Sequence, residues 1–220
     1  DLAARTLAAT GAHRRVQTVF VGGGTPSLLG AGPLATLLRA VDGAWGLAPD
    51  AEVTTEANPE STDPELLGGL REAGYTRVSL GMQSIAPHVL AVLERRHTPG
   101  RALQAARWAR EAGFEHVSLD LIYGTPGESD ADFADSLRAA TDTGVDHVSA
   151  YSLIVEPGTR LARQVRDKAL AAPSDDVLAD RYVIADDLLA AAGLHWYEVS
   201  NWASSPADRC RHNLAYWTGA

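Results

Sequence analysis

VFVGGGTPSLL, residues 19–29, is the stretch that decides the fold class of this chain. It joins a run of strand-forming residues, Val19 to Val21, to the three consecutive glycines Gly22, Gly23 and Gly24. A strand that ends in glycine lets a ligand approach the backbone closely. Because α/β proteins place their sites at the carboxyl edge of a parallel sheet, the stretch predicts a ligand site at its end. Taken alone, an ordinary turn between a strand and a helix explains it equally well.

Three copies of one unit follow and predict a parallel sheet. Each copy ends a helix at a glycine and begins a strand containing Val-Ser four residues later; the copies begin at Gly74, Gly113 and Gly144. Their spacing is near the roughly 30 or more residues of a βαβ unit. Strands and helices alternate without a hairpin pattern, so the chain forms either an open doubly wound sheet or part of a barrel.

Alternation in the strand at 117–122 distinguishes these two folds. Its odd-numbered residues are apolar, whereas Ser118, Asp120 and Ile122 share the other face. Strands of a doubly wound sheet are covered on both faces and are apolar throughout. A barrel lumen that holds a ligand tolerates serine and aspartate, so we expect an α/β fold in which the sheet forms a barrel. Residues 193–220 are expected to start a C-terminal extension.

Helix-start patterns and apolar spacing predict the individual elements. They place helix N-caps at Thr62, Thr98, Ser129 and Ser174. Gly74 is expected to end the helix that Thr62 begins. Further helices are predicted at 2–13, 31–45, 86–94, 99–112, 129–142, 158–170 and 174–192, and further strands at 16–22, 52–56 and 195–199.

The composition is that of an ordinary globular protein, with 45% hydrophobic and 21% charged residues among 220. A net charge of −9 argues against nucleic acid or an anionic membrane as the main partner, since both attract a basic face. No apolar run approaches the roughly 20 residues that span a bilayer. The single cysteine, Cys210, excludes an internal disulfide and an all-cysteine metal site within this chain. We expect a cytoplasmic protein.

Polar groups lie at or just past the ends of successive expected strands, and in a parallel barrel such ends share one rim. They are the turn at 23–25, Glu56, Gln83, Asp120 and Tyr151. A carboxylate in the lumen is costly unless it is hydrogen-bonded or paired, so Glu56 and Asp120 predict a bound molecule with hydroxyls or an amine. Alternatively, both carboxylates bind neighbouring backbone or pair with Arg95 or Arg96. Arg95 either binds a carboxylate of the ligand or ends its helix in solvent.

These stretches, taken in order, resemble one family. GGGTPSLL, EANPES, RVSLGMQS, LERRHTP, LDLIYGTPGES and the YSL run before EPGT are similar to those of radical S-adenosylmethionine proteins of the coproporphyrinogen III oxidase type, with the HemW branch nearest. The resemblance extends from residue 16 to residue 217. It implies a partial (β/α)6 barrel over residues 1–192 that carries S-adenosylmethionine and a [4Fe–4S] cluster.

The resemblance also implies roles for individual residues by matching position. Gly23, Gly24 and Thr25 would contact the methionine end of S-adenosylmethionine. The residues that would bind its amine, carboxylate or ribose are Glu56, Gln83, Arg95 and Asp120. Ile122 and the backbone of Leu153 and Ile154 would line the adenosine pocket. These assignments suit the chemistry, because carboxylates accept from hydroxyl and ammonium groups and arginine binds a carboxylate.

One departure from the family concerns the cluster. The family holds it with a C-x3-C-x2-C motif at the end of the first strand, and this chain has only Cys210, which cannot hold a cluster alone. We expect the chain to begin after that first strand, so that the barrel is missing it and the cluster occurs only in the complete protein; a natural homologue without a cluster is the alternative. We expect this polypeptide not to cleave S-adenosylmethionine and to bind it more weakly.

The end of the chain carries a second pattern. His212-Asn213-Leu214-Ala215-Tyr216-Trp217 matches the HNxxYW pattern that the resemblance associates with haem handling. A histidine among aromatic side chains suits axial ligation of haem iron, and a histidine that merely packs there is equally consistent.

Three functions follow as hypotheses. The first is a haem-trafficking protein that passes haem to an unidentified acceptor protein. The second is an enzyme, a coproporphyrinogen III dehydrogenase that acts by radical oxidative decarboxylation. The third is a phosphate- or nucleotide-binding domain that uses the glycine turn as an anion site, but no G-x-G-x-x-G or Gly-Lys-Ser/Thr pattern supports it.

Overall fold

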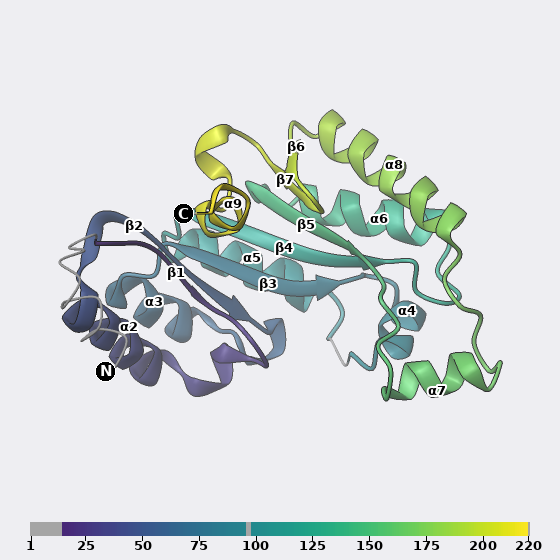
Figure 1. Cartoon of the computed structure of the whole chain (residues 1–220), viewed down its shortest axis with the longest axis horizontal. Coiled ribbons are helices and arrows are strands. Elements are labelled where there is room, and N and C mark those ends of the chain that lie inside the picture. Colours follow the sequence, from purple (N-terminus) through teal and green to yellow (C-terminus); the bar gives the residue numbers. More distant parts are fainter. Residues whose placement is uncertain (1–14, 96–97, 220) are drawn as a thin grey trace.

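The computed structural model describes residues 15–95 and 98–219, and a curved sheet forms the centre of that part of the chain (Figure 1). Its seven strands lie in the order β1-β2-β3-β4-β5-β7-β6. The first five pair in parallel: β1 (Val16–Val21), β2 (Leu47–Ala57), β3 (Arg77–Gln83), β4 (His116–Tyr123) and β5 (His147–Ser152). Because each strand lies beside the next one in the sequence, the sheet curls in one direction as half of a barrel instead of reversing as a doubly wound sheet does. The predicted partial barrel is confirmed.

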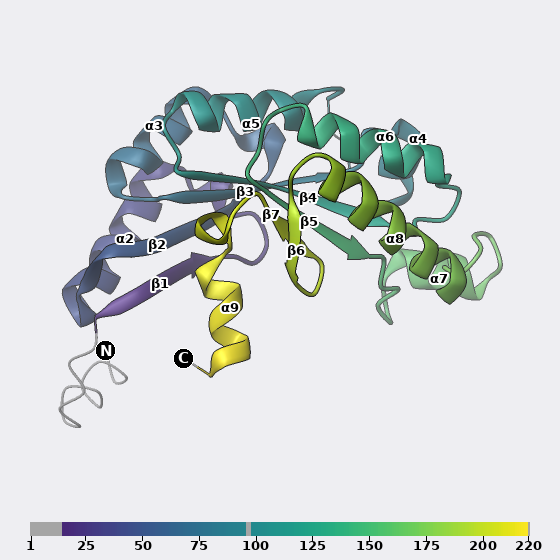
Figure 2. The same cartoon turned by 90° about the horizontal axis from the view of Figure 1, so that it is seen from above.

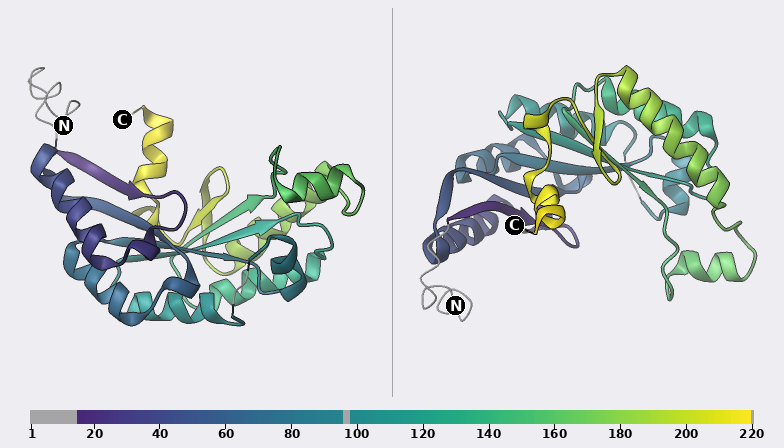
Figure 3. Two further views of the ribbon diagram at one scale, coloured as in Figure 1. Left: turned by 90° about the horizontal axis from the view of Figure 1, so that it is seen from below. Right: turned by 45° about the horizontal axis from the view of Figure 1, so that its top comes forward.

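Helices cover the outer, convex face of the sheet and leave much of its inner face uncovered (Figures 2 and 3). The covering helices are α2 (Ala31–Trp45), α3 (Pro64–Ala73), α5 (Arg101–Glu111) and α6 (Asp130–Thr141), with α8 (Asp175–Ala191) packed beside α6. Two short helices, α4 (Pro87–Val92) and α7 (Arg160–Arg166), follow the carboxyl ends of β3 and β5. Single 3-10 turns are η1 (Pro26–Leu29), η2 (Pro59–Ser61) and η3 (Pro206–Asp208). Among the described helices, each is too short or too polar to cross a membrane.

The apolar core lies between the convex face and these helices. Leu119 and Leu121 of β4 are fully buried against it, while Ser118 and Asp120 alternate with them on the inner face. Full burial of one such leucine contributes about 1.5–3 kcal/mol. The alternation predicted for this strand is therefore confirmed, and it places the polar side chains of β4 in the lumen.

Some predicted helix ends are confirmed and others are wrong. Ser129 caps α6, with Asp132 completing the reciprocal pair of bonds, and α3 ends at the left-handed Gly74. Thr62 does not cap α3: Asp63 does, by accepting from the backbone N–H of Leu66 at 2.8 Å. Pro64 then occupies the first helical position, which suits its missing N–H.

The start predicted for α5 is wrong for a tertiary reason. Thr98 was expected to cap it, but the helix begins at Arg101 after the left-handed Gly100. Thr98 instead donates its backbone N–H and its hydroxyl to Glu60, at 2.6 and 3.0 Å. The helix predicted at 2–13 lies outside the described residues.

The last part of the chain returns across the inner face. Strand β6 (His195–Glu198) matches the strand predicted at 195–199. Strand β7 (Asn201–Ala203) was not predicted; it lies between β5 and β6 and pairs antiparallel with both. Helix α9 (Arg211–Thr218) then lies in the hollow of the half-barrel, next to β1 (Figure 3).

Candidate functional site

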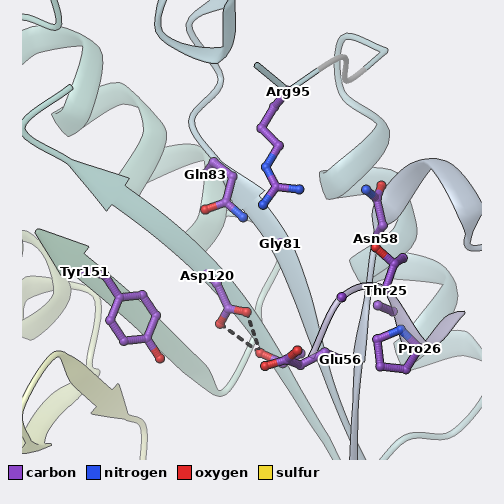
Figure 4. A pocket seen from close by; sticks show the side chains of 12 residues that line it. Thr25, Pro26, Glu56, Asn58, Gly81, Gln83, Arg95, Asp120 and Tyr151 are labelled. Atoms are coloured by element: carbon purple, nitrogen blue, oxygen red, sulfur yellow. Dashed lines mark hydrogen bonds between the residues drawn. The ribbon is translucent and has the colours of Figure 1, made fainter. Parts of the chain in front are cut away.

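A cavity of about 230 Å³ opens at the carboxyl ends of the parallel strands (Figure 4). Residues of successive strands and of the loops that follow them line it: Gly24, Thr25, Pro26, Glu56, Ala57, Asn58, Ser79, Gly81, Gln83, Arg95, Asp120 and Tyr151. The structure thus brings together six of the residues predicted for the cofactor site, namely Gly24, Thr25, Glu56, Gln83, Arg95 and Asp120. All of them come from the rim where a barrel of this kind has its site.

Glu56 holds the glycine turn against the rim. Its Oε2 accepts a hydrogen bond from the backbone N–H of Gly23 at 3.0 Å. Gly23 and Gly24 have φ angles of 87° and 62°, a left-handed conformation that glycine adopts without strain. At Gly22 a Cβ would come within 3.2 Å of the Glu56 carboxylate. The interpretation that Glu56 binds neighbouring backbone is therefore correct for Oε2. Among the described residues, Oε1 has no hydrogen-bond partner, so it can accept from a ligand in the cavity.

Asp120 lies on the inner face of β4 with serine hydroxyls around it. Ser79 Oγ lies 2.8 Å from each of its carboxylate oxygens, and Ser118 Oγ lies 3.4 Å from Oδ1. Burial raises the pKa of Asp120 to about 6, and the negative charge of Glu56 adds to that rise while the serine hydroxyls oppose it. The carboxyl group of Asp120 therefore titrates at about pH 6, well above an ordinary aspartate.

Gln83 and Arg95 complete the upper side of the cavity (Figure 4). Gln83 has a φ of 66°, and the pairing of β3 with β4 shifts register between Gly81 and Gln83, as at a β-bulge. Bulges of this kind re-aim a side chain near sites. Arg95 is exposed, and within residues 15–95 and 98–219 no ion pair joins it to Glu56 or Asp120. Its guanidinium is thus available to a ligand carboxylate.

Sequence reasoning did not predict five residues of the cavity lining, namely Pro26, Ala57, Asn58, Ser79 and Gly81. Ser79 binds Asp120, Asn58 lies beside the glycine turn, and a Cβ at Gly81 would lie 2.8 Å from Gln83 Nε2. Ser79 is the second residue of a repeated Val-Ser pair, so the repeat is the sequence pattern that could have predicted it.

The remaining residues predicted for the cofactor do not line the cavity. Gly23 contributes through its backbone N–H to Glu56. Ile122 is half-buried on β4 and pairs in register with Tyr151, a cavity residue. Ile154 lies beyond β5 and is 70% exposed. Their contact with adenosine stays a prediction.

His212, the residue predicted for haem, lies at a separate place on α9. Its Nδ1 is 3.1 Å from the hydroxyl of Thr18 on β1. Its ring stacks on Phe20, with centroids 5.2 Å apart and planes at 25°, and meets the edge of Tyr216 at 87°. On the other side of α9, Asn213 and Trp217 donate to the carboxylate of Glu198 on β6. Four positions of the HNxxYW pattern therefore have defined contacts.

A buried carboxylate, Glu52 of β2, fixes the first turn of α9. It accepts from the backbone N–H groups of Arg211 and His212, each at 3.0 Å. It also forms an ion pair with Arg77 at 3.3 Å, in which both side chains are almost fully buried. Sequence reasoning missed Glu52, although it shares a strand face with Glu56.

Cys210 is buried beside this carboxylate. It is 3% exposed, and its Sγ lies 3.5 Å from Glu52 Oε1. Burial raises the pKa of its thiol to about 12, with the Glu52 charge adding to that rise. A single thiol that resists ionisation does not fit the ligand set of an iron–sulfur cluster, which needs several thiolates. The residues of this chain therefore do not supply a cluster site.

Comparison with known proteins identifies the family of the chain. The sequence model of the Radical SAM superfamily matches residues 2–140. The chain is 64% identical over 219 residues to the heme chaperone HemW of Mycobacterium tuberculosis (strain H37Rv), which covers 100% of this chain and 55% of that protein. It is 39% identical over 204 residues to the heme chaperone HemW of Escherichia coli K12, covering 93% of this chain and 53% of that protein. The chain thus spans about half the length of these curated relatives.

A solved structure shares the fold. The coproporphyrinogen III oxidase HemN from Escherichia coli, described as a radical SAM enzyme, superposes with a TM-score of 0.79 at 24% identity. The match covers 99% of this chain and 50% of that one. The half-barrel described above is therefore shared with that protein.

Proposed function

The chain belongs to the radical SAM superfamily, in which it is similar to HemW and HemN proteins, and on this premise we propose that it forms the barrel part of a haem chaperone. The observation that carries the proposal is the setting of His212. Its imidazole is held by Thr18, Phe20 and Tyr216, and its Nε2 has no hydrogen-bond partner among the described residues. An oriented imidazole nitrogen with a free lone pair is the group that ligates haem iron.

In this proposal S-adenosylmethionine occupies the cavity at the strand ends. The carboxylates of Glu56 and Asp120 accept from its ammonium and ribose hydroxyl groups, and Arg95 binds its carboxylate. The turn at Gly23, Gly24 and Thr25 approaches its methionine end, Gln83 contributes an amide, and Ile122 and Ile154 border the adenosine. The side chains around the cavity fit these groups chemically, since carboxylates accept from hydroxyl and ammonium groups and an exposed guanidinium binds a carboxylate.

S-adenosylmethionine beside an iron–sulfur cluster supplies one-electron chemistry in proteins that hold both groups. This chain's part in the proposal is to bind and orient the adenosyl ligand and, separately, to bind haem. Residues 193–220 begin the extension that carries the haem contact. An unidentified acceptor protein and a cytoplasmic location belong to the same proposal.

A haem titration of the intact protein tests the function. We expect purified protein to take up ferric haem with a Soret band typical of histidine ligation, and His212→Ala to lose that band. His88→Ala is the matched control, because His88 lies on α4, far along the chain from α9, and is largely exposed. Uptake that is unchanged in His212→Ala would contradict the assignment of the ligand. Turnover of coproporphyrinogen III under anaerobic conditions would instead identify the dehydrogenase.

A further inference from the structure

We infer that Thr18 is the positioning residue for iron ligation by His212: its hydroxyl accepts Nδ1–H and so directs Nε2 to the haem. This inference rests on the proposed function and names the residue that prepares its ligand. Thr18 lies on β1, nearly two hundred positions before His212 in the sequence, and its Oγ1 is 3.1 Å from Nδ1. The HNxxYW pattern does not include it.

The two strands beside α9 hold His212 at both its backbone and its ring. Glu52 of β2 accepts a hydrogen bond from the backbone N–H of His212 at 3.0 Å, which fixes the position of this residue in the first turn of α9. On β1, Thr18 and Phe20 lie two residues apart and therefore share the strand face toward α9, while Val19 and Val21 pack against the core. Phe20 covers one face of the imidazole and Tyr216 meets its edge. The ring is therefore held in one orientation.

The proposed role of Thr18 is to keep the proton of the neutral imidazole on Nδ1. A neutral imidazole carries one N–H and one lone pair, and iron at Nε2 requires the proton to be on Nδ1. A hydroxyl oxygen accepts a hydrogen bond from this N–H, and the methyl group that replaces it in valine does not. Histidines that ligate metals generally donate their other N–H to a nearby acceptor, and loss of that acceptor lowers metal affinity about 10–100-fold. Thr18 Oγ1 is the acceptor that the structure provides, because no other described side chain bonds Nδ1.

The test compares Thr18→Val, Thr18→Ser and Thr36→Val in the intact protein. Valine keeps the shape of threonine and removes the hydroxyl, serine keeps the hydroxyl, and Thr36 is a control threonine on the exposed side of α2, where it bonds Gly32. Each protein is titrated with ferric haem and, separately, with metal-free protoporphyrin IX. The reduction potential of the bound haem is then measured.

We expect Thr18→Val to bind ferric haem about 10-fold more weakly and to bind metal-free protoporphyrin as the unchanged protein does. Its bound haem should have a higher potential, because an imidazole without an acceptor at Nδ1 donates less charge to iron. Thr18→Ser and Thr36→Val should match the unchanged protein in all three measurements.

The outcomes separate this inference from the function on which it rests. Equal haem affinity and potential in Thr18→Val, with haem lost in His212→Ala, would overturn the role of Thr18 and leave the haem function standing. Equal weakening toward haem and metal-free porphyrin would also overturn it, since Thr18 would then act through shape alone. No haem uptake by the unchanged protein would defeat the function itself. If Thr18→Val fails to fold, Thr18→Ala with the same two porphyrins answers the question.

Discussion

The hydroxyl of Ser79 lies 2.8 Å from both carboxylate oxygens of Asp120. A hydroxyl has one proton, so it serves one oxygen at a time and leaves acceptor capacity on the carboxylate. Since Asp120 also lines the cavity at the strand ends, that capacity is directed to whatever occupies the cavity. This pair of residues therefore gives the sharpest test of the proposed cofactor site.

Asp120→Asn should weaken binding of S-adenosylmethionine about 10–100-fold, because a hydrogen bond to a charged group contributes about 1.5–3 kcal/mol. Isothermal titration calorimetry of the intact protein under anaerobic conditions measures the change. Asp187→Asn, at an exposed position of α8, is the matched control and should bind normally. Normal binding by Asp120→Asn would remove Asp120 from the site.

The stability of the ligand-free protein should fall as the pH rises from about 4 to about 6. Burial raises the pKa of Asp120 from 3.8 to about 6 in the folded state, so the folded state binds more protons than the unfolded state across this window. Ionisation of Asp120 above this window then costs about 3 kcal/mol, at about 1.4 kcal/mol for each unit of the rise in pKa. Urea unfolding at several pH values measures the fall, and the Asp120→Asn protein should lack it. An equal fall in both proteins would assign the effect to other groups.

Replacement of Gly81 by alanine should impair the cavity more than the fold. The new Cβ would lie 2.8 Å from Gln83 Nε2, the end of a flexible side chain that can turn away. We expect the midpoint of urea unfolding to change little and the affinity for S-adenosylmethionine to fall several-fold. Gly68→Ala, on α3 with open space around its Cβ position, provides the comparison. If both substitutions leave affinity unchanged, Gln83 does not contact the ligand.

Glu56→Ala should loosen the glycine turn, whereas Glu56→Gln should keep it in place. An amide oxygen can still accept the N–H of Gly23, which now bonds Glu56 at 3.0 Å. Hydrogen exchange at the Gly23 amide is the measurement, and it should be faster in Glu56→Ala alone. Both variants lose the negative charge, so both should bind S-adenosylmethionine more weakly. Slow exchange in Glu56→Ala would show that the turn is held by other contacts.

Glu52→Gln should lower the free energy of unfolding by about 3–5 kcal/mol, because it leaves the buried Arg77 without a counter-charge. Glu115→Gln is the control: its carboxylate pairs with Arg71 at the surface, is 57% exposed, and should matter by less than about 0.5 kcal/mol. Chemical denaturation of both proteins measures the difference. A small effect at Glu52 would mean that water reaches the pair.

The parallel sheet was predictable because its pattern is local. The three Val-Ser units and the alternation around Asp120 depend on residues that are close in sequence. Helix starts were less predictable, since Thr98 has an N-cap composition but gives both of its donors to Glu60, about forty residues earlier. Strand β7 has three residues and is stabilised by pairing with β5, so no local pattern indicated it.

The candidate sites divide in the same way. Glu56 and Asp120 were predicted because a carboxylate at the end of a lumen strand needs an explanation. Glu52 has the same strand face and could have been predicted, but its partners Arg77 and His212 come from other elements. The contact of Thr18 with His212 could not be predicted, because a threonine in a strand carries no sequence pattern that indicates a distant histidine partner.

Helix α9 joins the two edges of the open half-barrel. Thr18 and Gln17 of β1 contact its first turn, and Glu198 of β6 binds Asn213 and Trp217 on its other side. In the proposed haem function, the contacts that link the two edges of the sheet through α9 also hold His212, the proposed haem ligand. On that proposal, a genetic screen for defective haem delivery should recover substitutions in both edge strands, β1 and β6, at the residues that hold α9.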